Sequence, residues 1–388
     1  MNHSLDCMTM QPGLLLLADG SVFEGELIGA EPPGGVATGE VVFNTVLSGY
    51  QEVISDPSYA GQIITFTYPH IGNYGVNEHD DESRRPFCRG VIVRDLARRR
   101  SSWRATDGLD AYLRRHGVPG LAGVDTRRLT RHIREAGAMP AAFGPIEGPG
   151  ASDEVALKAA ALAEPGTDGR NLAAEVSCVA PYTVPATGPA AGRGGRRIVA
   201  YDFGIKRTIL RHLRRLGEVT VVPAATPAAE TMAREPDGVF LANGPGDPVA
   251  VTYAVDAIRG LLGQVPIFGI CLGHQLLATS LGATTHKLPF GHHGGNHPVR
   301  RLASGQIEIT SQNHNYAVVD GSLGPDVEVT HVNLNDGVIE GIRCTSLPAF
   351  GVQYHPEAGP GPHDAAYLFA DFARLMDRAA PLRGAGVR

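Results

Sequence analysis

The sequence predicts a two-domain protein, in which an α+β amino-terminal domain is followed by an α/β domain with a doubly wound parallel sheet. Its 388 residues are too many for one ordinary hydrophobic core. A stretch rich in proline and glycine, 181–195, separates two halves of different character. Beyond it, apolar strand-like runs alternate with helical patterns, as in parallel sheets. We therefore assign 11–180 to the first domain, 181–195 to a linker and 196–382 to the second domain.

The composition is that of a globular chain, with 43% hydrophobic and 19% charged residues and a net charge of −6. This acidic balance predicts neither nucleic acid nor an anionic membrane as a partner. The apolar run at 14–17 is too short to cross a bilayer. Five scattered cysteines without a C-x-x-C pair predict no disulfide framework and no zinc site, and they fit a reducing cytoplasm. We expect the first ten residues to be disordered.

The amino-terminal half shows mostly strand and turn signals and no catalytic constellation. Asp19 and Gly20 form the expected turn of a hairpin between the runs at 14–17 and 21–25. The further elements that we expect in this half are strands at 40–45, 62–68 and 90–94 and helices at 109–116, 125–133 and 153–163.

The carboxyl-terminal half contains the alternating pattern. We expect strands at 197–203, 218–223, 236–241 and 266–270, with helices at 206–216 and 256–262. In doubly wound sheets, active sites lie beyond the carboxyl ends of the strands. Gly244, Cys271 and His355 all fall at such ends, which places a candidate site at one edge of the predicted sheet.

Cys271 ends an apolar strand and precedes a helix-like segment, and Gly269 and Gly273 flank it. A sharp strand-to-helix turn of this kind exposes its central side chain at the edge of a sheet, as nucleophile elbows do. The beginning of a helix also favours a thiolate. The alternative interpretation is a small buried cysteine without chemistry.

A base is available where a second apolar strand, 351–354, ends at His355. Pro356 keeps His355 out of a helix, so that Glu357 falls on the same side of an extended chain. A carboxylate in that position holds an imidazole in one tautomer and supports its charged form. Alone, this pattern also fits a strand end with an incidental histidine. Together with the cysteine turn, it favours a cysteine-nucleophile site.

Three motifs in this half, GICLGHQ at 269–275, HPE at 355–357 and NGPGDP at 243–248, resemble the class I, triad-type glutamine amidotransferases. The resemblance implies hydrolysis of glutamine to glutamate and ammonia through a cysteinyl thioester, with Cys271, His355 and Glu357 as the catalytic residues. It also implies glutamine binding by Gly246 and Gln275. For the oxyanion we assign the backbone N–H groups of Gly244 and Leu272, worth roughly 3–4 kcal/mol each. The glycine loop lacks the ending of a P-loop, so nucleotide binding is a poor fit.

The amino-terminal half resembles a domain that few amidotransferases carry, that of the carbamoyl-phosphate synthase small-chain family. The resemblance rests on FNT at 43–45, GYQE at 49–52, DPSY at 56–59 and YPHIGN at 68–73. It implies that Ser58 touches the bound glutamine. Without it, the Asp-Pro-Ser segment would be an ordinary turn.

Two further segments match this family. GHHGGNHP at 291–298 suggests a metal at first sight, but no Cys, Asp or Glu stands near it in the sequence, and the resemblance implies a structural loop and no metal. QNHNY at 312–316 matches the family's substrate-contacting turn and places Asn313, Asn315 and Tyr316 at the glutamine. The family usually has Gly-Phe where this chain has Asn315 and Tyr316. Since Asn tolerates positive φ, the backbone contact can persist.

The resemblance implies a cytoplasmic heterodimer, in which a large synthetase subunit binds ATP, magnesium and bicarbonate. This chain has no ATP motif, and we expect no cofactor in it. The large subunit would receive ammonia through an internal tunnel and make carbamoyl phosphate for arginine and pyrimidine biosynthesis.

Three alternatives remain at this point. The arginines between 84 and 100 suggest nucleic acid, but no stacking aromatics accompany them, and a solvated face or a protein-docking surface fits better. A glutaminase that serves guanylate or anthranilate synthesis would lack the amino-terminal domain. A non-catalytic glutamine-binding subunit would have no need of Cys271, His355 and Glu357 together.

Overall fold

The computed structural model describes residues 11–148, 150–192 and 195–384, so the expected disorder of the first ten residues lies outside the described part. The chain forms two compact units. The first contains the residues up to Asn44 together with Gln62–His79 and Cys88–Gly166. The second contains Thr45–Gly61 and Asp80–Phe87 in addition to the chain from Thr167 onward. Two short stretches of the amino-terminal half thus belong to the second unit. A single boundary along the chain therefore does not separate the two units.

The first unit is a closed barrel of seven strands in the order β1-β2-β8-β6-β4-β3-β9. The predicted hairpin is present, with Leu15 opposite Phe23, and β1 also pairs with β9, which closes the barrel. Closure depends on this long-range pairing and was not predicted from local patterns. The strands are β1 (Pro12–Leu17), β2 (Val22–Gly29), β3 (Ala37–Asn44), β4 (Gln62–Phe66), β6 (Gly90–Ile92), β8 (Pro119–Ala122) and β9 (Met139–Pro145), with a small sheet of β5 (His70–Ile71) and β7 (Asp95–Leu96).

The predicted helices of this unit are confirmed as α2 (Leu109–Arg115), α3 (Thr126–Ala136) and α4 (Glu154–Ala163). Asp125 and Asp153 cap α3 and α4, because their side chains accept hydrogen bonds from the backbone N–H groups of Arg128 and Ala156, respectively. The apolar side of α4 packs against β1 and β9. Among the described residues, no helix combines the length and the apolar character that a bilayer crossing needs.

The second unit contains a ten-stranded sheet in the order β10-β12-β11-β13-β14-β19-β18-β17-β15-β16. The five strands from β12 to β19 in this order run parallel, which confirms the predicted parallel core. The strands are β10 (Tyr182–Val184), β11 (Arg196–Asp202), β12 (Gly217–Pro223), β13 (Gly238–Leu241), β14 (Ile267–Ile270), β15 (Thr285–Arg301), β16 (Ile307–Val318), β17 (Val327–Asn333), β18 (Ile339–Cys344) and β19 (Ala349–Val352).

The antiparallel extension β18-β17-β15-β16 corrects two expectations. The segment 291–298 was expected to be a loop and 312–316 a turn, but they lie inside β15 and β16. Their glycines and polar residues hide the strand pattern, and the pairing of β15 with β16 shifts register twice. Such bulges interrupt the alternation from which a strand is predicted.

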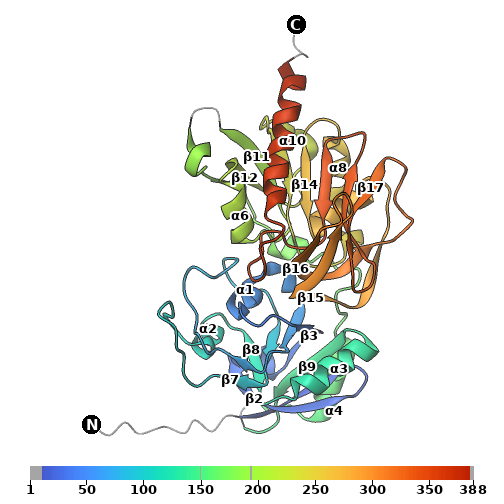
Figure 1. Ribbon diagram of the computed structural model, residues 1–388. Helices are drawn as coiled ribbons and strands as arrows, with labels where there is room; N and C mark the ends of the chain where they lie inside the picture. The colour runs from blue at the N-terminus through green and yellow to red at the C-terminus, as the bar shows by residue number, and fades with distance from the viewer. Residues whose placement is uncertain (1–10, 149, 193–194, 385–388) are drawn as a thin grey trace. The chain divides into compact units, whose positions relative to one another are not determined.

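Helices cover both faces of the parallel core (Figure 1). Along β11, Val199 and Tyr201 pack with α8 (Thr252–Leu261) and α9 (Leu272–Ser280). The intervening Ile198 and Ala200 pack with α6 (Arg207–Leu213) and α10 (Tyr367–Gly384). Successive residues of a strand point to opposite faces, so a fully apolar strand serves two cores. The remaining helices of this unit are α1 (Tyr50–Ser55), α5 (Ala173–Val176) and α7 (Ala228–Met232).

The turn from β14 into α9 is tight. Cys271 has φ 54° and ψ −109°, an unusual backbone conformation for a residue with a side chain. Its N–H donates to the Val352 carbonyl at 2.9 Å, which ties the turn to β19. A Cβ at Gly269 would lie 2.6 Å from the Gly273 oxygen, and one at Gly273 would lie 2.1 Å from the Leu241 oxygen. Both flanking glycines are therefore required by the close approach of backbone.

We predict that Gly273→Ala lowers the free energy of unfolding by about 2–4 kcal/mol, because the new methyl group would meet backbone that cannot rotate away. Gly324→Ala is the matched control, since nothing lies within 4 Å of its added Cβ, and it should change stability by less than about 0.5 kcal/mol. Urea denaturation followed by circular dichroism measures both. Equal stability of the two variants would show that the turn relaxes around the extra methyl group.

Candidate active site

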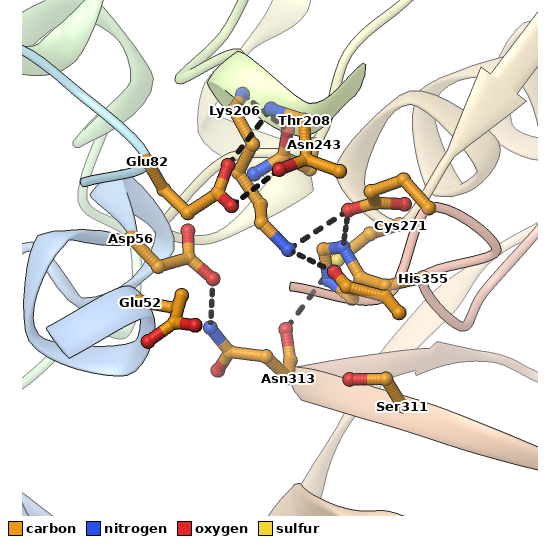
Figure 2. A network of polar contacts seen from close by, with 12 residues as sticks. Glu52, Asp56, Glu82, Lys206, Thr208, Asn243, Cys271, Ser311, Asn313 and His355 are labelled. Carbon is orange, nitrogen blue, oxygen red and sulfur yellow. Dashed lines mark hydrogen bonds and ion pairs between the residues drawn. The ribbon is translucent and has the colours of Figure 1, made fainter. Parts of the chain in front are cut away.

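The carboxyl ends of three neighbouring parallel strands bring the candidate site together. Asn243 follows β13, Cys271 follows β14, and His355 follows β19. Parallel strands end at the same edge of a sheet, so these side chains converge (Figure 2). The predicted edge is therefore where the structure places Gly244, Cys271 and His355.

His355 and Glu357 form a buried pair. The His355 Nδ1 lies 2.7 Å from the Glu357 Oε1, and both side chains are shielded from solvent. An Nδ1–H that donates to the carboxylate directs Nε2 away from Glu357. Burial lowers the pKa of His355, but the negative charge of Glu357 and the contact with the Cys271 thiol outweigh it and raise the pKa to about 10.

The Cys271 thiol is 2% exposed and lies beside His355 (Figure 2). Its Sγ donates to the Asn313 carbonyl oxygen at 3.5 Å. The thiol therefore contacts the imidazole of a residue that follows β19 and a backbone carbonyl of β16. This is the arrangement of a nucleophile, a base and an orienting carboxylate.

Lys206, just before α6, is buried, although its place in the sequence predicts only the beginning of a helix. Its Nζ donates to the Glu357 Oε1 at 3.0 Å and to the Ala358 carbonyl at 2.6 Å. Burial lowers the pKa of Lys206, but Glu357, Glu82 and Asp56 outweigh it and raise the pKa above the usual lysine value. Burial also raises the pKa of Glu357, whereas Lys206 and His355 lower it to about 2.

The sequence offered one weak signal for this role. The chain has three lysines among 34 basic residues, and only Lys206 directly follows the end of a predicted strand and its loop. Its partner Glu357 lies 151 positions away, so no local pattern links the two.

The two stretches of the amino-terminal half that belong to the second unit complete the surroundings of Lys206 (Figure 2). The Glu82 carboxylate accepts bonds from the backbone and the hydroxyl of Thr208 in the first turn of α6. A carboxylate is stabilised at a helix amino terminus, although burial raises the pKa of Glu82. Asp56 accepts a bond from the Asn313 Nδ2 at 2.8 Å.

Ser58, expected at the glutamine, lies in this unit and within reach of the strand ends. Its Oγ accepts a bond from the Asn243 Nδ2 at 2.9 Å, and its N–H donates to the Asp56 Oδ1. Gly244 lies against Phe203, whose oxygen would be 2.1 Å from an added Cβ, and Gly246 has φ 92°. Only glycine fits this loop closely. Leu272 is the first residue of α9, so its N–H has no partner within the helix.

The other residues expected at the glutamine use their side chains inside the protein. The Gln275 Nε2 donates to the Tyr316 carbonyl at 2.7 Å and to the Gln353 Oε1 at 3.0 Å. The Tyr316 hydroxyl donates to the Asp168 carboxylate at 2.7 Å. The Asn315 Oδ1 lies 2.9 Å from the His293 Nε2. These bonds fix the walls of the site.

The idea that Asn315 uses positive φ is wrong. The described non-glycine residues with positive φ are Glu235, Cys271 and Ala358, and Asn315 lies in the extended strand β16. The backbone of Asn315 would therefore meet glutamine in an extended conformation.

Comparisons with known proteins agree with this geometry. Residues 199–375 match the family described as "Glutamine amidotransferase class-I". The unit with the doubly wound sheet therefore contains a class-I glutamine amidotransferase domain. Residues 15–143 match "Carbamoyl-phosphate synthase small chain, CPSase domain".

Curated relatives match nearly the whole chain. The carbamoyl phosphate synthase small chain of Syntrophotalea carbinolica is 53% identical over 381 residues, covering 96% of this chain and 99% of that protein. Small chains of Chlorobaculum tepidum (52%, 95% and 98% covered) and a Synechococcus strain (50%, 96% and 95% covered) are similarly close. The chain belongs to the carbamoyl phosphate synthase small-chain family.

We predict that Lys206→Met lowers the free energy of unfolding by about 3–5 kcal/mol, because it leaves the Glu357 charge buried without its cation. Lys287→Met is the matched control, because the Lys287 ammonium forms a more exposed pair with Asp168 at 3.2 Å. Its loss should cost at most about 1 kcal/mol. Chemical denaturation of both variants tests the difference, and equal losses would contradict a structural role for the buried pair.

The raised pKa of His355 predicts a pH dependence of stability. Protonated His355 is favoured in the folded state, so its contribution is complete below the ordinary histidine pKa of about 6.5 and is lost as the pH rises toward about 10. The unfolding free energy of the native chain should therefore fall more steeply between pH 6.5 and 10 than that of His355→Gln. Parallel slopes would show that His355 is neutral in the folded chain.

Proposed function

We propose that this chain hydrolyses L-glutamine to glutamate and ammonia through a cysteinyl thioester and supplies the ammonia to a large synthetase subunit. The observation that carries the proposal is the Cys271 thiol beside an imidazole whose Nδ1 is 2.7 Å from the Glu357 carboxylate. The membership in the small-chain family supports it.

The first step forms the thioester. The Cys271 sulfur attacks the side-chain amide carbon of glutamine while the His355 Nε2 holds the proton that belonged to the thiol. The carbonyl oxygen becomes an oxyanion, which the N–H groups of Leu272 and Gly244 stabilise. His355 then gives its proton to the leaving nitrogen, so that the carbon–nitrogen bond breaks and ammonia departs.

The second step returns the enzyme to its starting state. His355 takes a proton from a water molecule whose oxygen attacks the thioester carbon. The carbon–sulfur bond then breaks, glutamate leaves, and the proton returns to the Cys271 sulfur. The atoms balance as one glutamine and one water giving one glutamate and one ammonia.

Glu357 and Lys206 serve this chemistry by position. Glu357 holds the His355 Nδ1–H, so that Nε2 remains the nitrogen that exchanges protons with sulfur, water and ammonia. Lys206 holds Glu357 in place and keeps it ionised. The raised pKa of His355 means that the imidazole retains the proton it takes until the leaving nitrogen accepts it.

Glutamine binding is proposed for the residues that resemble the family's pocket. Ser58, Gly246, Asn313, Asn315 and Tyr316 would line it mainly through backbone groups and the Ser58 hydroxyl. Gln275 would act by holding the Tyr316 carbonyl, since its amide donates there.

The partner follows from the relatives' names, since a small chain implies a large one. We propose that the large subunit holds ATP and magnesium, that this chain needs no cofactor or metal for glutamine hydrolysis, and that ammonia passes between the subunits without release. Supply of carbamoyl phosphate to arginine and pyrimidine biosynthesis in the cytoplasm is part of this proposal.

We predict that Cys271→Ser abolishes glutamine-dependent carbamoyl phosphate synthesis by the complex and leaves ammonia-dependent synthesis unchanged. The serine oxygen is a far weaker nucleophile at neutral pH, whereas ammonia bypasses the thioester. Both rates are measured on the same reconstituted complex with ATP and bicarbonate. A variant that still uses glutamine at the native rate would show that Cys271 is not the nucleophile.

Glutamate release by the native chain separates the remaining alternatives. Slow release alone, accelerated by the large subunit with ATP and bicarbonate, is the expected result. A rate of glutamate release that does not change with the large subunit would support glutaminase activity and contradict the proposed partner. No release in either case would favour a chain that only binds glutamine.

A further inference from the structure

A second buried polar cluster lies in the antiparallel part of the sheet. His292 in β15, His314 in β16 and Glu340 in β18 each offer one ligand atom, and these atoms lie within 4.8 Å of one another. All three side chains are buried. The histidine motif at 291–298 has no neighbouring carboxylate in the sequence, but folding brings two carboxylates to it, those of Glu340 and Asp336.

The His292 ring presents a lone pair to this cluster. Its Nε2 lies 2.7 Å from the Asp336 Oδ2, so in the neutral ring Nε2 carries the hydrogen and Nδ1 does not. The Nδ1 has no hydrogen-bond partner among the described residues, and the Glu340 Oε1 lies 3.8 Å from it. A carboxylate on one ring nitrogen with the other nitrogen unpartnered is the arrangement that metal-binding histidines adopt.

The His314 ring presents a second lone pair. Its Nδ1 lies 2.8 Å from the Tyr316 carbonyl oxygen, which can only accept, so Nδ1 carries the hydrogen. Its Nε2 lies 3.0 Å from the Gln312 Oε1. The Gln312 amide cannot easily turn over, because its Nε2 donates to the Glu340 Oε1 at 2.9 Å. In the neutral ring, two acceptors therefore face each other across 3.0 Å.

Glu340 presents a third ligand atom. Its Oε1 accepts bonds from Gln312 and from the Asn333 Nδ2 at 2.7 Å. Its Oε2 is buried and has no hydrogen-bond partner among the described residues. A fully buried carboxylate oxygen without a donor is costly unless a cation lies against it.

We propose that His292, His314 and Glu340 bind a divalent first-row transition metal ion such as Zn²⁺, with the Gln312 Oε1 as a fourth ligand. Two imidazoles and a carboxylate are a ligand set that zinc accepts. The carboxyl groups of Asp336 and Glu340 both face the His292 ring, which favours a cation in this cluster. Ligand atoms about 2.0–2.1 Å from a tetrahedral zinc lie about 3.3 Å apart. The His314 Nε2 and the Gln312 Oε1 are 3.0 Å apart, close to this value, and the three ligand atoms of His292, His314 and Glu340 lie within 4.8 Å of one another, so binding needs a modest inward shift of these three.

The competing occupant of the same lone pairs is a proton. A proton on the His292 Nδ1 would face the Glu340 carboxylate, but it would leave the His314 Nε2 and the Gln312 Oε1 facing each other as two acceptors. A metal ion satisfies both rings together.

The test uses the full chain without a histidine tag, equilibrated with Zn²⁺ or Co²⁺ and then freed of unbound metal. We expect about one metal ion per chain by mass spectrometry and, with Co²⁺, the visible absorption of a four-coordinate site. Glu340→Gln should reduce the bound metal at least about tenfold. Asp336→Asn, which changes a half-exposed residue outside the ligand set, should weaken binding by about 10–100-fold and is the safer variant for folding.

Two control variants exclude other sites. Glu308→Gln removes another buried carboxylate of β16 whose Oε1 has no partner among the described residues, and it should keep the metal. Cys271→Ser should keep it as well. Metal that disappears with Cys271→Ser and survives Glu340→Gln would assign it to the cysteine and overturn the proposal. Less than about 0.1 ion per native chain would also overturn it and leave a proton as the occupant.

Discussion

The buried ion pair of Lys206 and Glu357 is the interaction on which the candidate active site depends. Taking an ammonium and a carboxylate out of water costs several kcal/mol for each ion, and their attraction offsets this only when the geometry is good and the remaining donors are used. Here the Lys206 ammonium also donates to the Ala358 carbonyl, and Glu357 receives both Lys206 and His355 on one oxygen. The pair therefore fixes the turn after β19 against the beginning of α6, and with it the orientation of the imidazole.

The conformation of Cys271 is the complementary constraint. A non-glycine residue with φ 54° and ψ −109° costs of order 1–3 kcal/mol, and it persists only where its surroundings leave no other choice. The bond from its N–H to β19 and the backbone packed against Gly269 and Gly273 supply that restriction. Sulfur and imidazole are thus held by two independent devices on adjacent strands. Both devices consist of bonds and packing within the protein, which is what a preorganised site requires.

Sequence patterns were sufficient for the parts of this site that are local. The strand, glycine turn and helix around Cys271 and the spacing of His355 and Glu357 lie within a few residues, so their placement could be predicted. Lys206, Glu82 and Asp56 could not, because their partners are 126 to 257 positions away along the chain. The segments 291–298 of β15 and 312–316 of β16 were expected to be a loop and a turn, because glycines and register shifts mask the strand alternation there. The closed barrel could not be predicted either. Local sequence signals indicate individual strands, but they do not show that β1 pairs with β9.

Strand β16 connects the two polar clusters of the second unit. Successive residues of a strand point to opposite faces, so Asn313 and His314 face different sides of β16. Asn313 offers its carbonyl to the Cys271 thiol and its amide to Asp56. His314 is held by the Tyr316 carbonyl and the Gln312 amide on its own side. The backbone that accepts from the nucleophile is therefore anchored from both faces. The position of the Asn313 carbonyl therefore depends on the bonds that hold His314 as well as on the contacts of the candidate site.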